Sequence, residues 1–282
     1  MKILPHALAL ALSLGAACLR GEDTPAPAVP HENVKVGGKV IHFVPPTGGF
    51  VRCDGLNAGW DTASTSMLPA TNRRLIAFST PADRDAIKAG QAPAFTRSFN
   101  SQITTSVEFK DVGEQDFQQQ RAAVRAGLEQ MRGKLQTTAD SLVKKGNASL
   151  HDKYGVDAAL SLNDLAVVGP YMETASSFGF TLVMNIKGIP GKEGRSEKAV
   201  VACLMLPVNG RLLNLYANSE YRDDADREWA EKAVAQWRDA LVAANDRVLT
   251  AHGGPDPAYI AGAATGAAVV GLLVLLITRR KA

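Results

Sequence analysis

The sequence contains few cysteines and histidines, the residues that cross-link small folds through disulfides or bind metal ions. It has 3 cysteines, 5 histidines and 6% aromatic residues among 282 positions. A disulfide-dense scaffold is therefore excluded, while 46% hydrophobic residues are enough for a folded domain with its own core. The histidines are scattered, and no H-x-x-H, H-E-x-x-H or clustered cysteine spacing occurs. We expect no metal site and no cofactor.

A strong charge of one sign is also missing. The formal net charge is +3, but the terminal segments account for it, since acidic residues slightly outnumber basic ones in the chain between them. The basic residues of these terminal segments are Lys2, Arg20, Arg279, Arg280 and Lys281. A nearly neutral domain offers no basic face for phosphates, so we expect no nucleic-acid partner.

The N-terminus has the three-part plan of a secretory signal peptide at residues 1–17. Lys2 precedes an apolar run that extends from Ala7 to Leu14, and small residues follow it. Residues 18–33 are rich in proline and are predicted to form a linker. The lipidation of Cys18 after cleavage stays open, because Gly15 stands where a lipoprotein signal usually has leucine.

The C-terminus has the features of a transmembrane helix at residues 259–278. This segment has no charged residue, and its length matches the hydrocarbon core of a bilayer. Basic residues in the tail at 279–282 favour the cytoplasmic side, namely Arg279, Arg280 and Lys281. With the signal peptide, this predicts a single-pass protein of the cell membrane whose domain lies on the extracytoplasmic, periplasmic side. Residues 250–258 contain glycine and proline and are predicted to form a hinge. A sorting tail that is removed by processing is the alternative.

Gly262 and Gly266 form a GxxxG pattern within this apolar segment. Glycines at this spacing let two helices approach closely in lipid, which would give a homodimer through the transmembrane helix. In a segment so rich in alanine, small residues also occur without such a contact. Both alternatives stay open.

Residues 34–249 are long enough for one domain with a full core. Between Phe178 and Ile186, large apolar residues alternate with smaller or polar ones, which predicts a half-buried strand. Two further apolar runs flank Asn209-Gly210, the strongest short signal for a β-hairpin. These three strands are predicted to form a meander.

The two-residue turn also predicts the register of the hairpin. One face is expected to pair Leu206 with Leu213, Leu204 with Leu215, and Ala202 with Ala217. Cys203 and Tyr216 are expected to lie together on the opposite face.

Two amphipathic helices are predicted, at residues 116–145 and at residues 223–249. The second begins with acidic residues that suit the positive end of the helix dipole, and Trp229 and Trp237 lie on its apolar stripe. Further strands are predicted at residues 49–53, 73–78 and 103–109, and a short helix at 84–89. Strands that neighbour along the chain favour an antiparallel sheet with flanking helices, an α+β fold.

The order of five segments resembles the PsbP/Mog1/DcrB-like group of α/β/α accessory domains. These segments are PPTGGFV, NRRLIAFS, EQDFQQQ, the meander around VNG, and NSEYRDDADREWAEKAVAQW. The resemblance covers residues 40–245 and includes no catalytic motif. It implies a non-enzymatic role, because members are extrinsic subunits, binding factors or envelope lipoproteins. The chain departs from an envelope lipoprotein in its weak lipidation signal and in its C-terminal apolar segment.

No catalytic constellation follows from linear motifs. A G-x-S-x-G nucleophile elbow is absent, and the glycines of residues 188–194 connect two predicted strands, whereas a P-loop connects a strand to a helix. Asp54, Asp61 and Glu173 would act as an acid and a base only if the fold brought two of them together. We expect no catalytic residue.

Cys53 and Cys203 are the cysteines of the predicted domain, whereas Cys18 lies in the linker. An exported protein meets an oxidising environment, so they either form a disulfide or stay two separate buried thiols. The sequence does not choose between these alternatives. Redox catalysis is not expected, because C-x-x-C is absent.

These features predict a membrane-anchored extracytoplasmic accessory or protein-interaction module without catalytic activity. Its expected partners are the lipid bilayer and a protein of the membrane or envelope. The alternative is a hydrolase or small-ligand-binding domain tethered at the membrane surface, with a cleft that linear motifs do not reveal.

Overall fold

The computed structural model describes residues 31–66, 68–91, 93–128, 144, 148, 161–187 and 196–245. The described strands are β1 (Glu32–Val36), β2 (Lys39–Phe43), β3 (Val51–Arg52), β4 (Asn72–Ser79), β5 (Arg97–Thr104), β6 (Ser161–Thr174), β7 (Ser177–Lys187), β8 (Ser196–Val208) and β9 (Arg211–Glu220). The described helices are α1 (Ala58–Ser66), α2 (Pro81–Lys88), the 3-10 helix η1 (Thr105–Val107) and α4 (Asp224–Ala243), and residues 114–128 are also helical.

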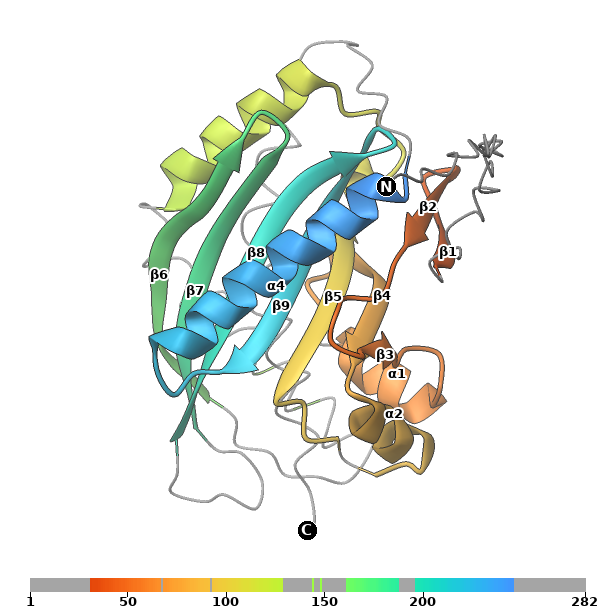
Figure 1. Cartoon of the computed structure of the whole chain (residues 1–282), viewed down its shortest axis with the longest axis vertical. Coiled ribbons are helices and arrows are strands. Elements are labelled where there is room, and N and C mark those ends of the chain that lie inside the picture. Colours follow the sequence, from red (N-terminus) through yellow and green to blue (C-terminus); the bar gives the residue numbers. More distant parts are fainter. Residues whose placement is uncertain are drawn as a thin grey trace, which may run out of the picture.

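Seven strands form one antiparallel sheet in the order β3-β4-β5-β9-β8-β7-β6, and β1 and β2 form a separate hairpin (Figure 1). The predicted meander is confirmed as β7, β8 and β9. Its predicted register is confirmed as well, since Leu206 pairs with Leu213 and Cys203 with Tyr216. Asn209 and Gly210 both have positive φ, at 48° and 72°, as a tight hairpin turn requires.

The main core lies between the sheet and α4, which runs across one face of the sheet in Figure 1. The side chain of Asp223 caps α4 by accepting a hydrogen bond from the backbone N–H of Ala225 at 2.9 Å. Trp237 is 1% exposed and contacts the rings of Phe78 and Phe99, and its indole N–H donates to the carbonyl of Val44 at 2.8 Å. A tryptophan with a bonded N–H contributes its full apolar area to the core without an unpaired polar group.

The opposite face of the sheet packs against the helical residues 114–128. Phe117, Val124 and Leu128 are buried there, which confirms the stripe predicted for this part of the helix. Val124 lies against Phe180 of β7 and Tyr216 of β9. Helices therefore cover both faces of one antiparallel sheet, and the α+β fold with flanking helices is confirmed.

The strand predicted at residues 103–109 is wrong. The strand is β5, which ends at Thr104, and η1 follows it. Because the chain leaves the sheet at this point, the alternation of apolar residues does not continue as a buried face, and Phe109 is 76% exposed.

The β1–β2 hairpin, α1, η1 and β6 were not predicted. β1 begins at Glu32, within the segment 18–33 that the sequence assigns to a linker. No helix in the described ranges is long and apolar enough to span a membrane. The segments predicted as signal peptide, hinge, transmembrane helix and basic tail lie outside those ranges.

Candidate functional site

Four segments meet at one end of the domain, which we call the Phe109 end. They are residues 36–40 around the β1–β2 turn, residues 108–112, the β8–β9 turn at 209–211, and Asn245 after α4. The backbone N–H of Val112 donates to the carbonyl of Gly210 at 2.9 Å, which joins the second segment to the third. Each segment is distant from the others in sequence, so only the folded sheet brings them together.

Arg211 is the centre of this end and is 4% exposed. Its guanidinium donates to the carbonyls of Gly37 and Lys110, both at 2.8 Å, and to a carboxylate oxygen of Asp111 at 2.7 Å. Lys39 also pairs with Asp111, and hydrogen bonding from Lys39 is the main cause that lowers the pKa of that carboxyl. A buried guanidinium that is satisfied by two carbonyls and a carboxylate holds three segments in fixed positions.

Glu108 connects the same end to β4 and to the β1–β2 turn. Its carboxylate accepts from Arg73 Nε at 3.1 Å and from the backbone N–H of Gly37 at 3.3 Å. The hydrogen bond from Arg73 is the main cause that lowers the pKa of Glu108. Gly37 has φ +53°, and a Cβ at this position would lie 1.8 Å from the carbonyl oxygen of Glu108. The turn therefore requires glycine for both its backbone conformation and its close approach.

Asn245 fixes the C-terminal end of α4 to this end of the domain. Its side-chain oxygen accepts from the backbone N–H of His42 at 2.9 Å and from Asn209 Nδ2 at 3.3 Å. Its side-chain nitrogen donates to the carbonyls of His42 at 2.9 Å and Leu241 at 2.7 Å. With 5% exposure, this amide is fully used in bridging the helix, β2 and the β8–β9 turn.

Phe109 and Val40 are exposed at this end, at 76% and 44%. Neighbouring residues on both segments are held by the contacts of Arg211, Lys39 and Glu108. The Phe109 end thus presents two apolar side chains on a fixed backbone.

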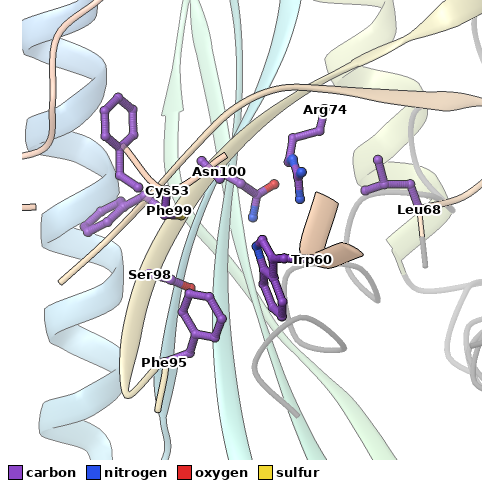
Figure 2. Close-up of a pocket in the computed structure, with 10 residues that line it drawn as sticks. Cys53, Trp60, Leu68, Arg74, Phe95, Ser98, Phe99 and Asn100 are labelled. Atoms are coloured by element: carbon purple, nitrogen blue, oxygen red, sulfur yellow. The ribbon is translucent and has the colours of Figure 1, made fainter. Parts of the chain in front are cut away.

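A small cavity lies beneath α1, between β3, β4 and β5. Its volume is about 20 Å³, which is room for about one water molecule. Figure 2 shows the guanidinium of Arg74 and the amide of Asn100 directed toward Trp60, with Phe95 next to the tryptophan. The rings of Trp60 and Phe95 are 5.3 Å apart. Arg74 donates to Ser64 Oγ at 2.7 Å and to Asp61 at 3.2 Å, so its charge serves to hold α1 on the sheet.

Cys53 also lines this cavity, and burial raises the pKa of its thiol to about 12. A thiol with this pKa is protonated at neutral pH, whereas catalysis needs the thiolate. Burial likewise raises the pKa of the Cys203 thiol. Neither thiol is suited to act as a nucleophile.

A second cavity of about 10 Å³ lies between β8, β9 and the helical residues 114–128. Asn214 and Tyr216 line it together with Val124, Cys203 and Met205. The Tyr216 hydroxyl is buried and has no hydrogen-bond partner in the described part of the chain. Gln120, one turn before Val124, is 2% exposed and its amide is likewise unpaired among the described residues. Buried polar groups are normally hydrogen-bonded, so Tyr216 and Gln120 stand out among the described residues of this layer.

The two cysteines are free and buried in the structure. The backbone N–H of Cys53 bonds to the carbonyl of Ala77 beside β4, whereas Cys203 lies in β8. With β4, β5 and β9 between them, they are about 19 Å apart at the usual strand spacing. A disulfide needs Cα atoms within about 7 Å, so the structure has two separate thiols, the second of the predicted alternatives.

Of the carboxylates considered as an acid–base pair, Glu173 lies apart from Asp54 and Asp61, whereas Asp61 accepts a hydrogen bond from the backbone N–H of Gly55, next to Asp54, at 3.0 Å. Asp54 accepts from the backbone N–H of Ala77 at 2.8 Å, and Asp61 pairs with Arg74 near the same edge of the sheet. Glu173 lies in β6 at the other edge and pairs with Arg125 at 2.9 Å. Within the described ranges, no group of three or more His, Cys, Asp and Glu residues is arranged to hold a metal ion. The residues predicted for helix dimerisation and orientation, Gly262, Gly266, Arg279, Arg280 and Lys281, lie outside the described ranges.

Sequence reasoning missed the Phe109 end. Gly37-Gly38 between two short alternating runs is a hairpin signal that indicates β1 and β2. No comparable signal exists for Arg211 or Asn245, because their partners come from segments 100 or more positions away in several cases.

No family model matches the sequence, and no curated protein matches it. Among solved structures, the chain is similar to a point mutant of the protein Mog1, with 13% identity over 82% of this chain and 100% of that one, at a TM-score of 0.32. It is also similar to the Ran-binding protein Mog1p of Saccharomyces cerevisiae, with 12% identity over 77% of this chain and 95% of that one, at a TM-score of 0.31. The likeness to these two structures concerns the fold alone.

Proposed function

We propose that this chain is a membrane-anchored, extracytoplasmic accessory module that binds a partner protein and has no catalytic activity. The observation that carries the proposal is the attachment of Asn245. Four hydrogen bonds lock the end of α4 to β2, to the β8–β9 turn and to the preceding helical turn. The chain continues from this point toward the apolar residues 259–278.

This attachment supports a tethered role because it limits the distance between domain and membrane. Residues 246–258 reach at most about 45 Å even when fully extended. A domain held within this distance meets other membrane proteins at high effective concentration, which favours weak and reversible binding.

The described cavities support a role without catalysis. Each has room for about one water molecule, whereas pockets for small molecules usually have about 300 Å³ or more. The charged groups near them, such as Arg74 and Asp61, are paired with each other and hold α1 on the sheet. These two charges therefore serve to stabilise the fold.

The anchor is tested with the full chain carrying an epitope tag after Ala282, in sealed right-side-out membrane vesicles. We expect the chain to resist extraction by alkaline carbonate. External protease is expected to cut in residues 250–258 and to leave the tag protected. Val270→Arg combined with Leu273→Arg is the matched control, because charges at the centre of a span strongly disfavour insertion. Release of the unmodified chain by carbonate, or digestion of its tag, contradicts the proposal.

A further inference from the structure

We propose that the Phe109 end of the domain rests on the surface of the lipid bilayer, with the Phe109 side chain inserted among the lipid headgroups. This inference rests on the proposed membrane anchor and adds the orientation of the domain. It names the bilayer, and not a second protein, as the occupant of this surface.

The first argument is the place where the chain leaves the domain. Asn245 is bound to His42 and Asn209, and both lie in segments of the Phe109 end. The carbonyl of Val40 accepts from the same Asn209 amide at 3.2 Å. The exit point of the tether and the exposed Val40 are therefore neighbours. The end of the domain that carries the exit is the end that the tether holds toward the membrane.

The second argument is the exposed aromatic side chain. Phe109 is 76% exposed, and among the described residues the other large hydrophobic side chains with high exposure are Val40 at the same end and Val168 in β6. Aromatic side chains are enriched where protein meets the headgroup region, because partial burial among lipids removes their apolar surface from water. The fixed backbone around Phe109 means that little conformational freedom is lost on insertion.

The charges around Phe109 are compatible with headgroups. Lys39 and Lys110 lie on the same two segments, Lys35 precedes the first of them, and Asp111 and Glu108 are each held by basic partners. The acidic groups at this end are therefore neutralised within the domain. An exposed apolar side chain with lysines on the neighbouring segments suits a membrane surface that contains anionic lipids.

The size of the apolar surface favours the bilayer over a protein partner. A specific protein interface usually buries about 800 Å² on each side around a core of several apolar residues. Two exposed side chains, Phe109 and Val40, are too few for such a core. A bilayer requires no matching shape, and the tether supplies the proximity that a small contact lacks. In this orientation α1 and α2, at the opposite end of β4 and β5, point away from the membrane and stay accessible to a partner protein.

The test places a photoreactive benzoylphenylalanine at single positions of the full chain in vesicles of phosphatidylethanolamine and phosphatidylglycerol with a clickable lipid. Position 109 is compared with position 88, an exposed site in α2 at the other end of the sheet, and with position 168, an exposed apolar site in β6. We expect a lipid adduct at position 109 and none above background at position 88 or 168. Circular dichroism identical to that of the unmodified chain checks that each variant is folded.

The outcomes separate the inference from the proposal on which it rests. The orientation is wrong and the anchor stands if carbonate leaves the chain in the vesicles but position 109 gives no lipid adduct. The same holds if position 109 cross-links to a second copy of the chain or labels lipid no more than position 168 does. If carbonate releases the chain, the anchor is wrong and the inference fails with it. Phe109→Ser provides a second measurement. We expect protease to cut the hinge, residues 250–258, faster in this variant, while its resistance to carbonate extraction stays unchanged. An unchanged rate of cleavage in the hinge contradicts the inference.

Discussion

At the scale of single residues, the buried Tyr216 and the half-buried Tyr171 have opposite hydrogen-bonding situations. The Tyr171 hydroxyl donates to the carbonyl of Cys203 at 3.0 Å, whereas the Tyr216 hydroxyl has no partner among the described residues. Burial is the main cause that raises the pKa of both phenols, so both are neutral at physiological pH. The two side chains differ in whether a hydrogen-bond partner of the hydroxyl is present among the described residues and in exposure, since Tyr171 is half-buried and Tyr216 is fully buried.

Tyr216→Phe removes a buried hydroxyl that has no hydrogen-bond partner among the described residues. We expect the free energy of unfolding to stay within about 0.5 kcal/mol of the unmodified chain or to rise by up to about 1 kcal/mol. Tyr171→Phe is the matched control, and it should lower the same free energy by about 1 kcal/mol, since it removes a made hydrogen bond. Urea unfolding followed by tryptophan fluorescence measures both. A clear loss of stability in Tyr216→Phe would show that its hydroxyl bonds to a bound group.

The cysteines give a prediction about pH. An unfolded thiol loses its proton near pH 8.5, whereas burial raises the pKa of Cys53 to about 12. Between these values the folded chain binds more protons than the unfolded chain, so stability is complete below about pH 8.5 and falls as pH rises toward 12. At pH 9 we expect iodoacetamide to modify Cys53 rapidly in urea and slowly in the folded chain, read by peptide mass spectrometry. Rapid modification of folded Cys53 contradicts its buried, protonated state.

At the scale of elements, the Phe109 end depends on the close turn between β1 and β2. Gly37→Ala would place a Cβ 1.8 Å from the carbonyl oxygen of Glu108 at a φ of +53°. The turn would have to move away from Arg211, and we expect the free energy of unfolding to fall by about 3 kcal/mol or more. Gly38→Ala tests backbone strain alone, because Gly38 has φ +83° and an added Cβ would have no atom within 4 Å. We expect this variant to lower the free energy of unfolding by about 1 kcal/mol. Equal losses in the two variants would contradict the close packing at Gly37.

Asn245 gives a prediction for the attachment of α4. Asn245→Ala leaves the backbone N–H and carbonyl of His42 without their partner, and we expect a loss of about 2 kcal/mol or more. Gln236→Ala on the exposed face of the same helix should cost less than about 0.5 kcal/mol. Hydrogen exchange should also become faster in β2 and in the β8–β9 turn of Asn245→Ala. Unchanged exchange there would contradict the bridging role of this residue.

Elements with a local signal could be predicted from the sequence. The Asn209-Gly210 turn determines the pairing of β8 with β9, because its two positive φ angles form a tight turn that joins the two strands directly. β6 was missed because its pairing with β7 shifts register at three points, and Gly169 and Pro170 interrupt its pattern. The alternation at residues 103–109 was misleading because η1 turns the chain out of the sheet, which leaves Phe109 exposed.

The candidate site was less accessible to sequence reasoning than the fold. Arg211 binds Gly37 and Asp111, and Asn245 binds His42, across long stretches of chain. These contacts arise from the strand order of the sheet, which no local pattern encodes. The separation of Cys53 from Cys203 has the same origin, since it depends on which strands lie between them.

At the scale of the whole molecule, the described part of the chain ends at Asn245, which is bound at the Phe109 end, while α1 and α2 lie at the other end (Figure 1). Helices cover both faces of the sheet, and each cavity in the described part of the chain has room for about one water molecule. This arrangement supports a module that acts by being held in place beside a partner. The proposed orientation leaves α1 and α2 as the accessible end.

The most direct test of this account is cross-linking of the full chain in its native membrane. Mild-detergent co-purification and mass spectrometry follow, beside a version that ends before Pro255. The account predicts a reproducible protein partner for the full chain that is lost in the shortened version. A full chain without any partner, together with turnover of a small molecule that a single polar substitution abolishes, would contradict it.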